Sequence, residues 1–115
     1  MAIAIHTSYI HMKITKTEAL VLQQLVSAAG SELYGLEMVK AADGALKMGS
    51  VYVILGRLQD KGFVESRREE LAQDSDRSVP RRLYKVTGAG RRIYLAYEAA
   101  MSAYEQGING ALAHV

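Results

Sequence analysis

Hydrophobic residues recur every three or four positions along most of this chain, a spacing that is typical of amphipathic α-helices. The first clear helix follows Thr15, whose hydroxyl and the Glu18 carboxylate are placed to cap each other's backbone amides. We predict that this helix runs to about Ala29 and stops at Gly30. Its apolar residues cover more than one stripe, so it is either a central core helix or a helix whose second face meets another subunit.

A second helix is predicted from Leu33 to Ala42, ended by the turn residues Asp43 and Gly44. Its expected inward-facing residues are Leu36, Met38 and Val39. The short segment Ala45–Lys47 is expected to pair as a small strand.

A third helix is predicted to begin with Ser50 as its cap and to close at Lys61-Gly62. Its periodic apolar residues are Val51, Ile54, Leu55 and Leu58. Two helices joined by a tight turn are typical of a helix-turn-helix, in which the second helix reads DNA. The alternative is a plain amphipathic surface helix, and this segment alone does not decide between them.

The region after this helix predicts a hairpin. Residues 63–68 alternate as an exposed strand does, residues 69–78 are polar and acid-rich, and residues 81–86 form the partner strand behind Pro80. Thr87 then caps a last helix to about Gln106, with Gly107 and Gly110 loosening its end. The predicted fold is mainly α with a small β-hairpin wing, a winged helix-turn-helix followed by a C-terminal helix. We expect a flexible extension (1–13), the winged domain (14–86), the last helix (87–106) and a flexible tail (107–115).

Composition narrows the class of protein. A chain of 115 residues forms one domain, and half of its residues are hydrophobic, as in ordinary globular proteins. The absence of cysteine excludes disulfides and thiolate metal sites and favours a cytoplasmic location, and no apolar run is long enough to span a membrane.

The distribution of charge along the chain indicates more about its partner than the formal net charge of +2 does. Most of the positive charge lies between Arg57 and Arg92, and after Arg92 the charged residues are Glu98 and Glu105. This distribution predicts an anionic partner for one end of the molecule only.

The outward face of the third helix carries the candidate contacts to duplex DNA. The hydroxyl of Ser50 or Tyr52 can bind phosphate, Arg57 can bind phosphate or guanine, and Val53 can touch a thymine methyl. Lys47 and Gly49 precede them and complete this set.

Wing arginines form the second candidate set, suited to phosphates beside or inside the minor groove: Arg67, Arg68, Arg77, Arg81 and Arg82. The alternative is a solvated hairpin that uses arginine to blunt its edges. The acidic neighbours in the loop favour that alternative at its tip, so the strand arginines are stronger candidates than Arg77.

Catalytic and metal sites are not indicated. The three histidines, His6, His11 and His114, have no carboxylate at a metal-ligand spacing, and Gly88-Ala89-Gly90 lacks the rest of a dinucleotide fingerprint. We therefore predict that the chain is not an enzyme and carries no cofactor or metal.

Three blocks of sequence, residues 34–38, 49–65 and 80–90, together resemble the PadR family of bacterial transcriptional regulators. The resemblance covers roughly residues 13–104 and is closest to the short, single-domain members. It implies a homodimeric winged-helix repressor that binds a palindromic operator, with Gly49, Ser50 and Tyr52 close to DNA. The chain departs from the family's pattern at Met48, often proline, and at Ser78-Val79, often Gly-Arg.

In this family the last helix dimerises, and in short members it does so against the first helix. The residues assigned to this interface are Leu20, Ile93, Tyr94, Tyr97, Ala100, Met101 and Tyr104. The tyrosines could instead line a pore for a small, flat aromatic effector, although the tryptophan usual in such members is missing. Two other functions stay open: a winged helix that docks an acidic protein surface instead of DNA, and an architectural DNA binder with little sequence preference.

Overall fold

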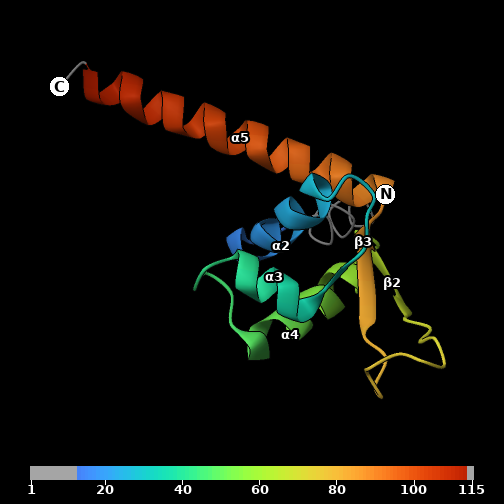
Figure 1. Cartoon of the computed structure of the whole chain (residues 1–115). Helices are drawn as coiled ribbons and strands as arrows, with labels where there is room; N and C mark the ends of the chain where they lie inside the picture. The colour runs from blue at the N-terminus through green and yellow to red at the C-terminus, as the bar shows by residue number, and fades with distance from the viewer. Residues whose placement is uncertain (1–12, 114–115) are drawn as a thin grey trace.

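The computed structural model describes residues 13–113. Helices α2 (Lys16–Ser27), α3 (Gly35–Ala41) and α4 (Met48–Asp60) pack beneath the long helix α5 (Gly88–Ala113), with a small sheet at one side (Figure 1). The sheet is antiparallel and has the order β1-β3-β2, formed by Leu33–Tyr34, Arg82–Val86 and Val64–Arg68. The expected architecture, mainly helical with a β-hairpin wing, is confirmed.

Helix α2 begins as predicted. The Glu18 amide donates to the Thr15 hydroxyl at 3.1 Å, and the Thr15 amide donates to the Glu18 carboxylate at 2.8 Å, so both ends of the capping box are made. The helix ends near the predicted position, with Ala28 as its C-cap and Gly30 at a φ of 89°. Its residues Val21, Leu22 and Leu25 are fully buried and form the centre of the core.

The second helix differs from the prediction at its start, and so does the loop that follows it. Leu33 and Tyr34 form β1, paired with Tyr84 and Leu83 of β3, so α3 begins only at Gly35. No strand forms at Ala45–Lys47, where Leu46 is instead buried in the hydrophobic core.

Helix α3 also faces differently from the prediction. Met38 is fully buried, while Leu36 is 40% exposed and was wrongly placed in the core. Residues two apart on a helix lie about 200° apart around its axis, so a helix that buries Met38 turns Leu36 outward.

Helix α4 buries the four predicted residues, Val51, Ile54, Leu55 and Leu58. Its start was mispredicted: the N-cap is Lys47, whose side chain makes no capping hydrogen bond, and Ser50 lies inside the first turn. Ser50 is consequently free of a capping role and exposed on the outer surface.

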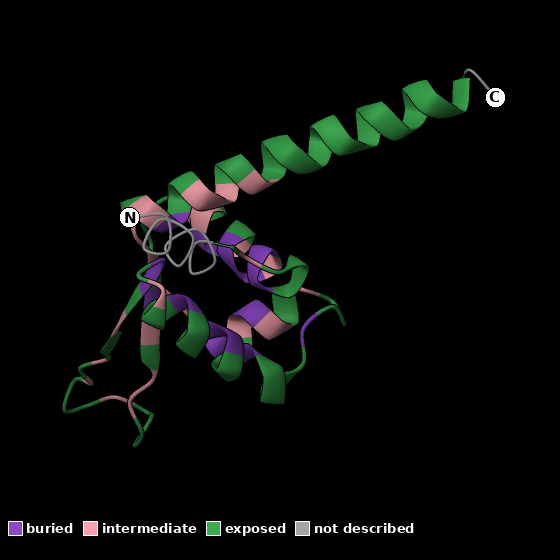
Figure 2. Ribbon diagram, turned by 180° about the vertical axis from the view of Figure 1, so that it is seen from behind, coloured by how far each residue is buried: buried purple, intermediate pink, exposed green. Residues whose placement is uncertain are grey.

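Helix α5 begins at the predicted cap, where the Gly90 amide donates to the Thr87 hydroxyl at 3.0 Å. Gly90 is buried against β2, and a Cβ there would overlap the carbonyl oxygen of Phe63. The helix then continues without a break to Ala113, so the predicted end at Gln106 was wrong. Its distal part extends past the rest of the chain and is exposed on all sides (Figure 2).

Within the described residues no helix is long and apolar enough to cross a membrane. The same residues hold no group of three or more acidic or histidine side chains arranged to bind a metal. The histidines singled out in the sequence, and nearly all of the expected N-terminal extension, lie outside the described range.

Candidate nucleic-acid interface

The outer face of α4 brings the predicted reading residues together. Tyr52 and Val53 are 47% and 54% exposed. The remaining members of the set are also exposed: Lys47, Gly49, Ser50 and Arg57. The face therefore offers two hydroxyls, two cations and an aliphatic side chain to a partner.

A groove of about 400 Å³ adjoins this face, between α4 and the start of α2. Besides residues of α4 it is lined by Thr15 and Thr17. Thr15 was predicted only as a cap and Thr17 was not a candidate, because nothing in the spacing shows that the start of α2 adjoins α4. Both add polar atoms beside Ser50 and Arg57.

Tyr52 lies directly over the start of α3. A Cβ added to Gly35 would meet the Tyr52 ring and hydroxyl at 2.8–2.9 Å, so the ring occupies space that only glycine leaves open. Gly35 thus determines where Tyr52 stands, a role that its place in a predicted helix did not indicate.

The wing arginines are exposed to different degrees and most have partners within the chain. Arg67 forms a two-pronged ion pair with Glu32, with both distances at 2.7 Å. Arg82 donates to the Ser66 hydroxyl at 2.9 Å, and Arg68, opposite it on β2, is exposed.

Arg77 and Arg81 share Glu69 as a partner. Arg77 donates to its carboxylate at 2.6 Å, and Arg81 lies 3.6 Å from the same oxygen with its guanidinium 4.1 Å above the Tyr34 ring. The hydrogen bond and charge of Arg77 and the contacts of Arg81 outweigh desolvation and lower the pKa of Glu69 to about 2. Arg77 is therefore occupied by one of the acidic neighbours that made it a weaker candidate than the strand arginines.

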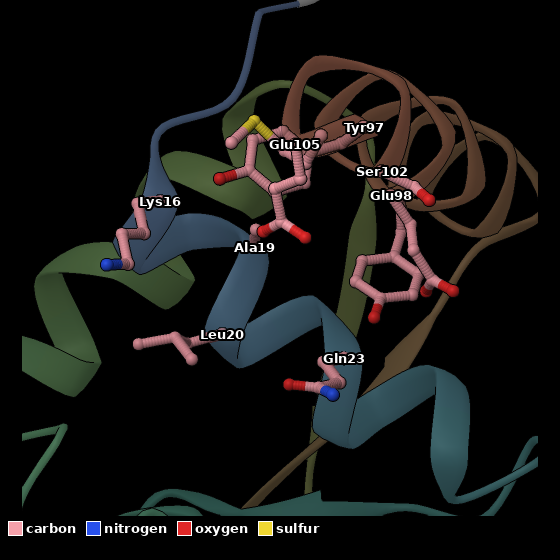
Figure 3. Close-up of a pocket in the computed structure, with 10 residues that line it drawn as sticks. Lys16, Ala19, Leu20, Gln23, Tyr97, Glu98, Ser102 and Glu105 are labelled. Carbon is pink, nitrogen blue, oxygen red and sulfur yellow. The ribbon is translucent and has the colours of Figure 1, made fainter. Parts of the chain in front are cut away.

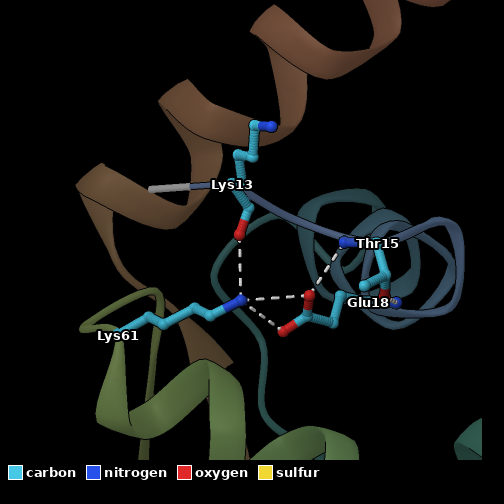
Figure 4. Close-up of polar contacts among 4 residues, drawn as sticks. All are labelled: Lys13, Thr15, Glu18 and Lys61. Carbon is cyan, nitrogen blue, oxygen red and sulfur yellow. Dashed lines mark hydrogen bonds and ion pairs between the residues drawn. The ribbon is translucent and has the colours of Figure 1, made fainter. Parts of the chain in front are cut away.

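A buried ion pair fixes α4 relative to α2 (Figure 4). The Lys61 ammonium donates to both oxygens of Glu18, at 2.8 and 3.1 Å, and to the Lys13 carbonyl at 2.9 Å. Burial alone would raise the pKa of Glu18, but Lys61 and the Thr15 amide overcome it and the pKa is lowered. Local spacing indicates a cap at Glu18 and a helix end at Lys61, but not their contact, because 43 residues separate the two.

A second groove, of about 410 Å³, separates α2 from α5 (Figure 3). Four of the predicted interface residues line it: Leu20, Tyr94, Tyr97 and Met101. Of the others, Ile93 packs against the core of its own chain, whereas Ala100 and Tyr104 are exposed. Lys16, Glu98 and Glu105 give the groove polar edges, and burial together with Glu98 raises the pKa of Tyr94.

Comparison with solved structures supports the fold. A PadR family regulator from Clostridium difficile is 21% identical with a TM-score of 0.71, over 85% of this chain and 99% of that one. A second, from Eggerthella lenta, is 24% identical with a TM-score of 0.68, over 96% and 89% of the two chains. The Bacillus subtilis PadR structure in complex with operator DNA is 19% identical with a TM-score of 0.59, over 70% of this chain and 45% of that protein.

Comparison with curated protein sequences gives no significant match. The family description "Transcriptional regulator PadR-like family" matches residues 21–96, from the core of α2 through the wing to the first part of α5. This match covers most of the winged helix and identifies a transcription regulator. The chain belongs to the PadR-like family of transcriptional regulators.

Proposed function

We propose that this regulator is a homodimer that binds a palindromic DNA operator sequence-specifically and represses transcription there. The observation that carries the proposal is the outer face of α4, where Ser50, Tyr52, Val53 and Arg57 are exposed together beside a groove with further hydroxyls. An α-helix fits the major groove of B-DNA, and these side chains match phosphate, guanine and thymine-methyl groups. The Bacillus subtilis structure, which holds operator DNA, supports the same partner.

The wing supports α4 in this role. Arg68 and Arg82 are exposed on the paired strands β2 and β3, at the end of the hairpin that leads into the loop. Contacts from these side chains to phosphate would add affinity for any sequence, while α4 supplies the selectivity.

Dimerisation is supported by the apolar side chains that the distal part of α5 exposes. Met101, Tyr104, Ile108 and Leu112 are 39–66% exposed and recur at spacings of three and four, so they form one apolar stripe along the distal helix. A second copy that covers this stripe and the groove against α2 would place two α4 helices about a two-fold axis. A symmetric dimer reads a palindrome, because each half-site meets the same helix.

The groove between α2 and α5 also supports a response to a flat aromatic cation. Tyrosine rings attract a cation through their faces, and Glu98 and Glu105 supply the opposite charge. Titration with a planar cationic dye at saturating concentration should quench tyrosine fluorescence and change the affinity for DNA. Unchanged fluorescence and affinity would contradict an effector site there.

The test of the main proposal is fluorescence anisotropy with a pool of native promoter fragments, including the region upstream of the protein's own gene, at two salt concentrations. We expect one fragment to bind far more tightly than the rest and to lose affinity steeply as salt is added. Repression is then checked with a reporter under that promoter. Uniform binding to all fragments would favour an architectural role, and no binding by a folded dimer would favour an acidic protein partner.

A further inference from the structure

The loop of the wing is closed at its base by Glu69, which follows β2 and faces Arg81 just before β3. The Glu69 amide donates to the Arg81 carbonyl at 2.8 Å, one step beyond the last paired residues of the two strands, Arg68 and Arg82. The Glu69 carboxylate turns toward the same partner and accepts from the Arg81 amide at 3.4 Å. One acidic side chain is therefore held among the cations of the wing by backbone pairing.

Two arginines of the candidate DNA surface are engaged by this carboxylate. Arg77 donates to it at 2.6 Å, and the Arg81 Nε lies 3.6 Å from the same oxygen. That second distance is too long for a hydrogen bond, and among the described residues the buried Arg81 Nε has no hydrogen-bond partner. Arg81 is consequently held by charge attraction and by its stacking on Tyr34, 4.1 Å from the ring centre.

These contacts are weak enough to be exchanged. The side chains of Arg77, Arg81 and Glu69 are 39%, 34% and 18% exposed, so water and salt screen their attraction. Ion pairs of this kind contribute little to stability, because solvent competes for both partners. A phosphate group of a bound duplex offers the same arginines an anionic partner and can replace the carboxylate.

We propose that Glu69 is an internal competitor of DNA, whose carboxylate occupies Arg77 and Arg81 until phosphate displaces it. The inference rests on the proposed DNA-binding function and adds a residue that limits its affinity. Because phosphates carry no sequence information, the competition weakens binding to the operator and to unrelated duplexes by the same factor. Selectivity stays with α4, and the regulator is kept from saturating non-specific DNA.

The test compares Glu69→Gln with Glu70→Gln. The first variant keeps an oxygen that can accept from the Arg81 amide but removes the charge that engages Arg77 and Arg81. The second removes the same charge from the next residue, which is exposed and acts on Arg67 only through space. Circular dichroism and thermal melting establish that both variants remain folded.

Anisotropy titrations with the operator and with an unrelated duplex of equal length, at several salt concentrations, measure the effect. Glu69→Gln should tighten both complexes by about threefold to tenfold, which lies within the range that two exposed ion pairs can supply. The dependence of log affinity on log salt should change little, because phosphate reaches the same two arginines in the wild-type and the variant complexes. Glu70→Gln should give a clearly smaller change.

A second measurement shows whether the gain passes through the arginines. In a chain that carries Arg77→Ala and Arg81→Ala, the further change Glu69→Gln should bring no gain. Affinity that is unchanged or weaker in Glu69→Gln would overturn the inference and indicate that Glu69 organises the wing for binding. An equal gain from Glu70→Gln would overturn it in favour of general charge. If the wild-type chain binds no duplex, the proposed function fails and this inference fails with it.

Discussion

Arg57 and Arg81 are both candidate DNA contacts, but their surroundings differ. Arg57 is exposed on α4 beside the groove shared with α2, whereas Arg81 is stacked on Tyr34 at the edge of the wing. A side chain on the reading helix can meet a base edge, and one on the wing meets the sugar-phosphate backbone. Their removal should therefore change binding in different ways.

We predict that Arg57→Ala weakens operator binding by about 1–3 kcal/mol and relaxes the preference for one base position. Arg81→Ala should weaken all duplexes alike and flatten the salt dependence. Anisotropy against the operator and its single-base variants measures both effects. If both variants bind the operator as the wild type does, the assigned DNA face is wrong.

Gly35 offers a way to move Tyr52 without changing it. In Gly35→Ala the new methyl would lie 2.8 Å from the Tyr52 ring, and because a ring end can swing away, the free energy of unfolding should fall by less than about 1 kcal/mol. Operator affinity should fall severalfold, because the ring is displaced from its place on the reading face.

The matched control for this change is Gly56→Ala, on the exposed surface of α4 with no atom within 4 Å of the added Cβ. Alanine is the better helix former, so this control should gain up to about 1 kcal/mol in stability and leave Tyr52 in place. Equal operator affinity in Gly35→Ala and wild type would mean that the position of Tyr52 does not matter for binding.

Among the elements, α5 is the one whose extent the sequence predicted least well. Its glycines, Gly107 and Gly110, lower helix propensity, yet the helix runs through both to Ala113. At 26 residues it is about 39 Å long, and only its first part packs on the rest of the chain. A long helix with an exposed apolar stripe is expected to find a partner.

We predict that Met101→Asp or Tyr97→Asp shifts the protein from dimer to monomer, because each places a charge in the groove between α2 and α5. Light scattering over a range of protein concentrations gives the mass directly. Ala99→Asp adds the same charge to an exposed site that does not line this groove, and it should leave the mass unchanged. A dimer that persists in both groove variants would refute the assigned interface.

Over the whole molecule, the ion pair of Glu18 and Lys61 connects α2, which lines the groove against α5, to the end of α4, whose outer face is the proposed DNA-binding surface. Glu18 is 1% exposed and ionised, so it is stable there only with Lys61 and the Thr15 amide around it. Its pKa is lower in the folded chain than the usual 4.5, so ionised Glu18 stabilises the fold at neutral pH.

This pair predicts a pH dependence of stability. A lowered pKa gives stability that is fully present above about 4.5 and is lost as pH falls through the folded-state value. Glu18→Gln should lower the free energy of unfolding by about 2 kcal/mol at pH 7. The difference from wild type should shrink as pH falls below 4.5, as measured by urea unfolding at each pH. A difference that stays constant with pH would show that the charge of Glu18 does not contribute.

The sequence by itself determined the features that depend on neighbours along the chain. The capping box at Thr15, the apolar face of α4 and the cap at Thr87 follow from contacts within a few residues, and all three were predicted correctly. The exposed face of α4 followed too, because the residues that a helix does not bury must face away from the core.

Tertiary structure decided what depends on distant partners. Leu33 and Tyr34 pair with β3 and leave the helix that their apolar pattern favoured, since ladder hydrogen bonds to a strand some 50 residues later satisfy their backbone. The same holds for the site: only the packed fold places Thr17 beside α4, Gly35 under Tyr52, and Lys61 on Glu18. Local patterns specify which face of a helix is buried, but the residues it meets are set by how the helices and the sheet pack.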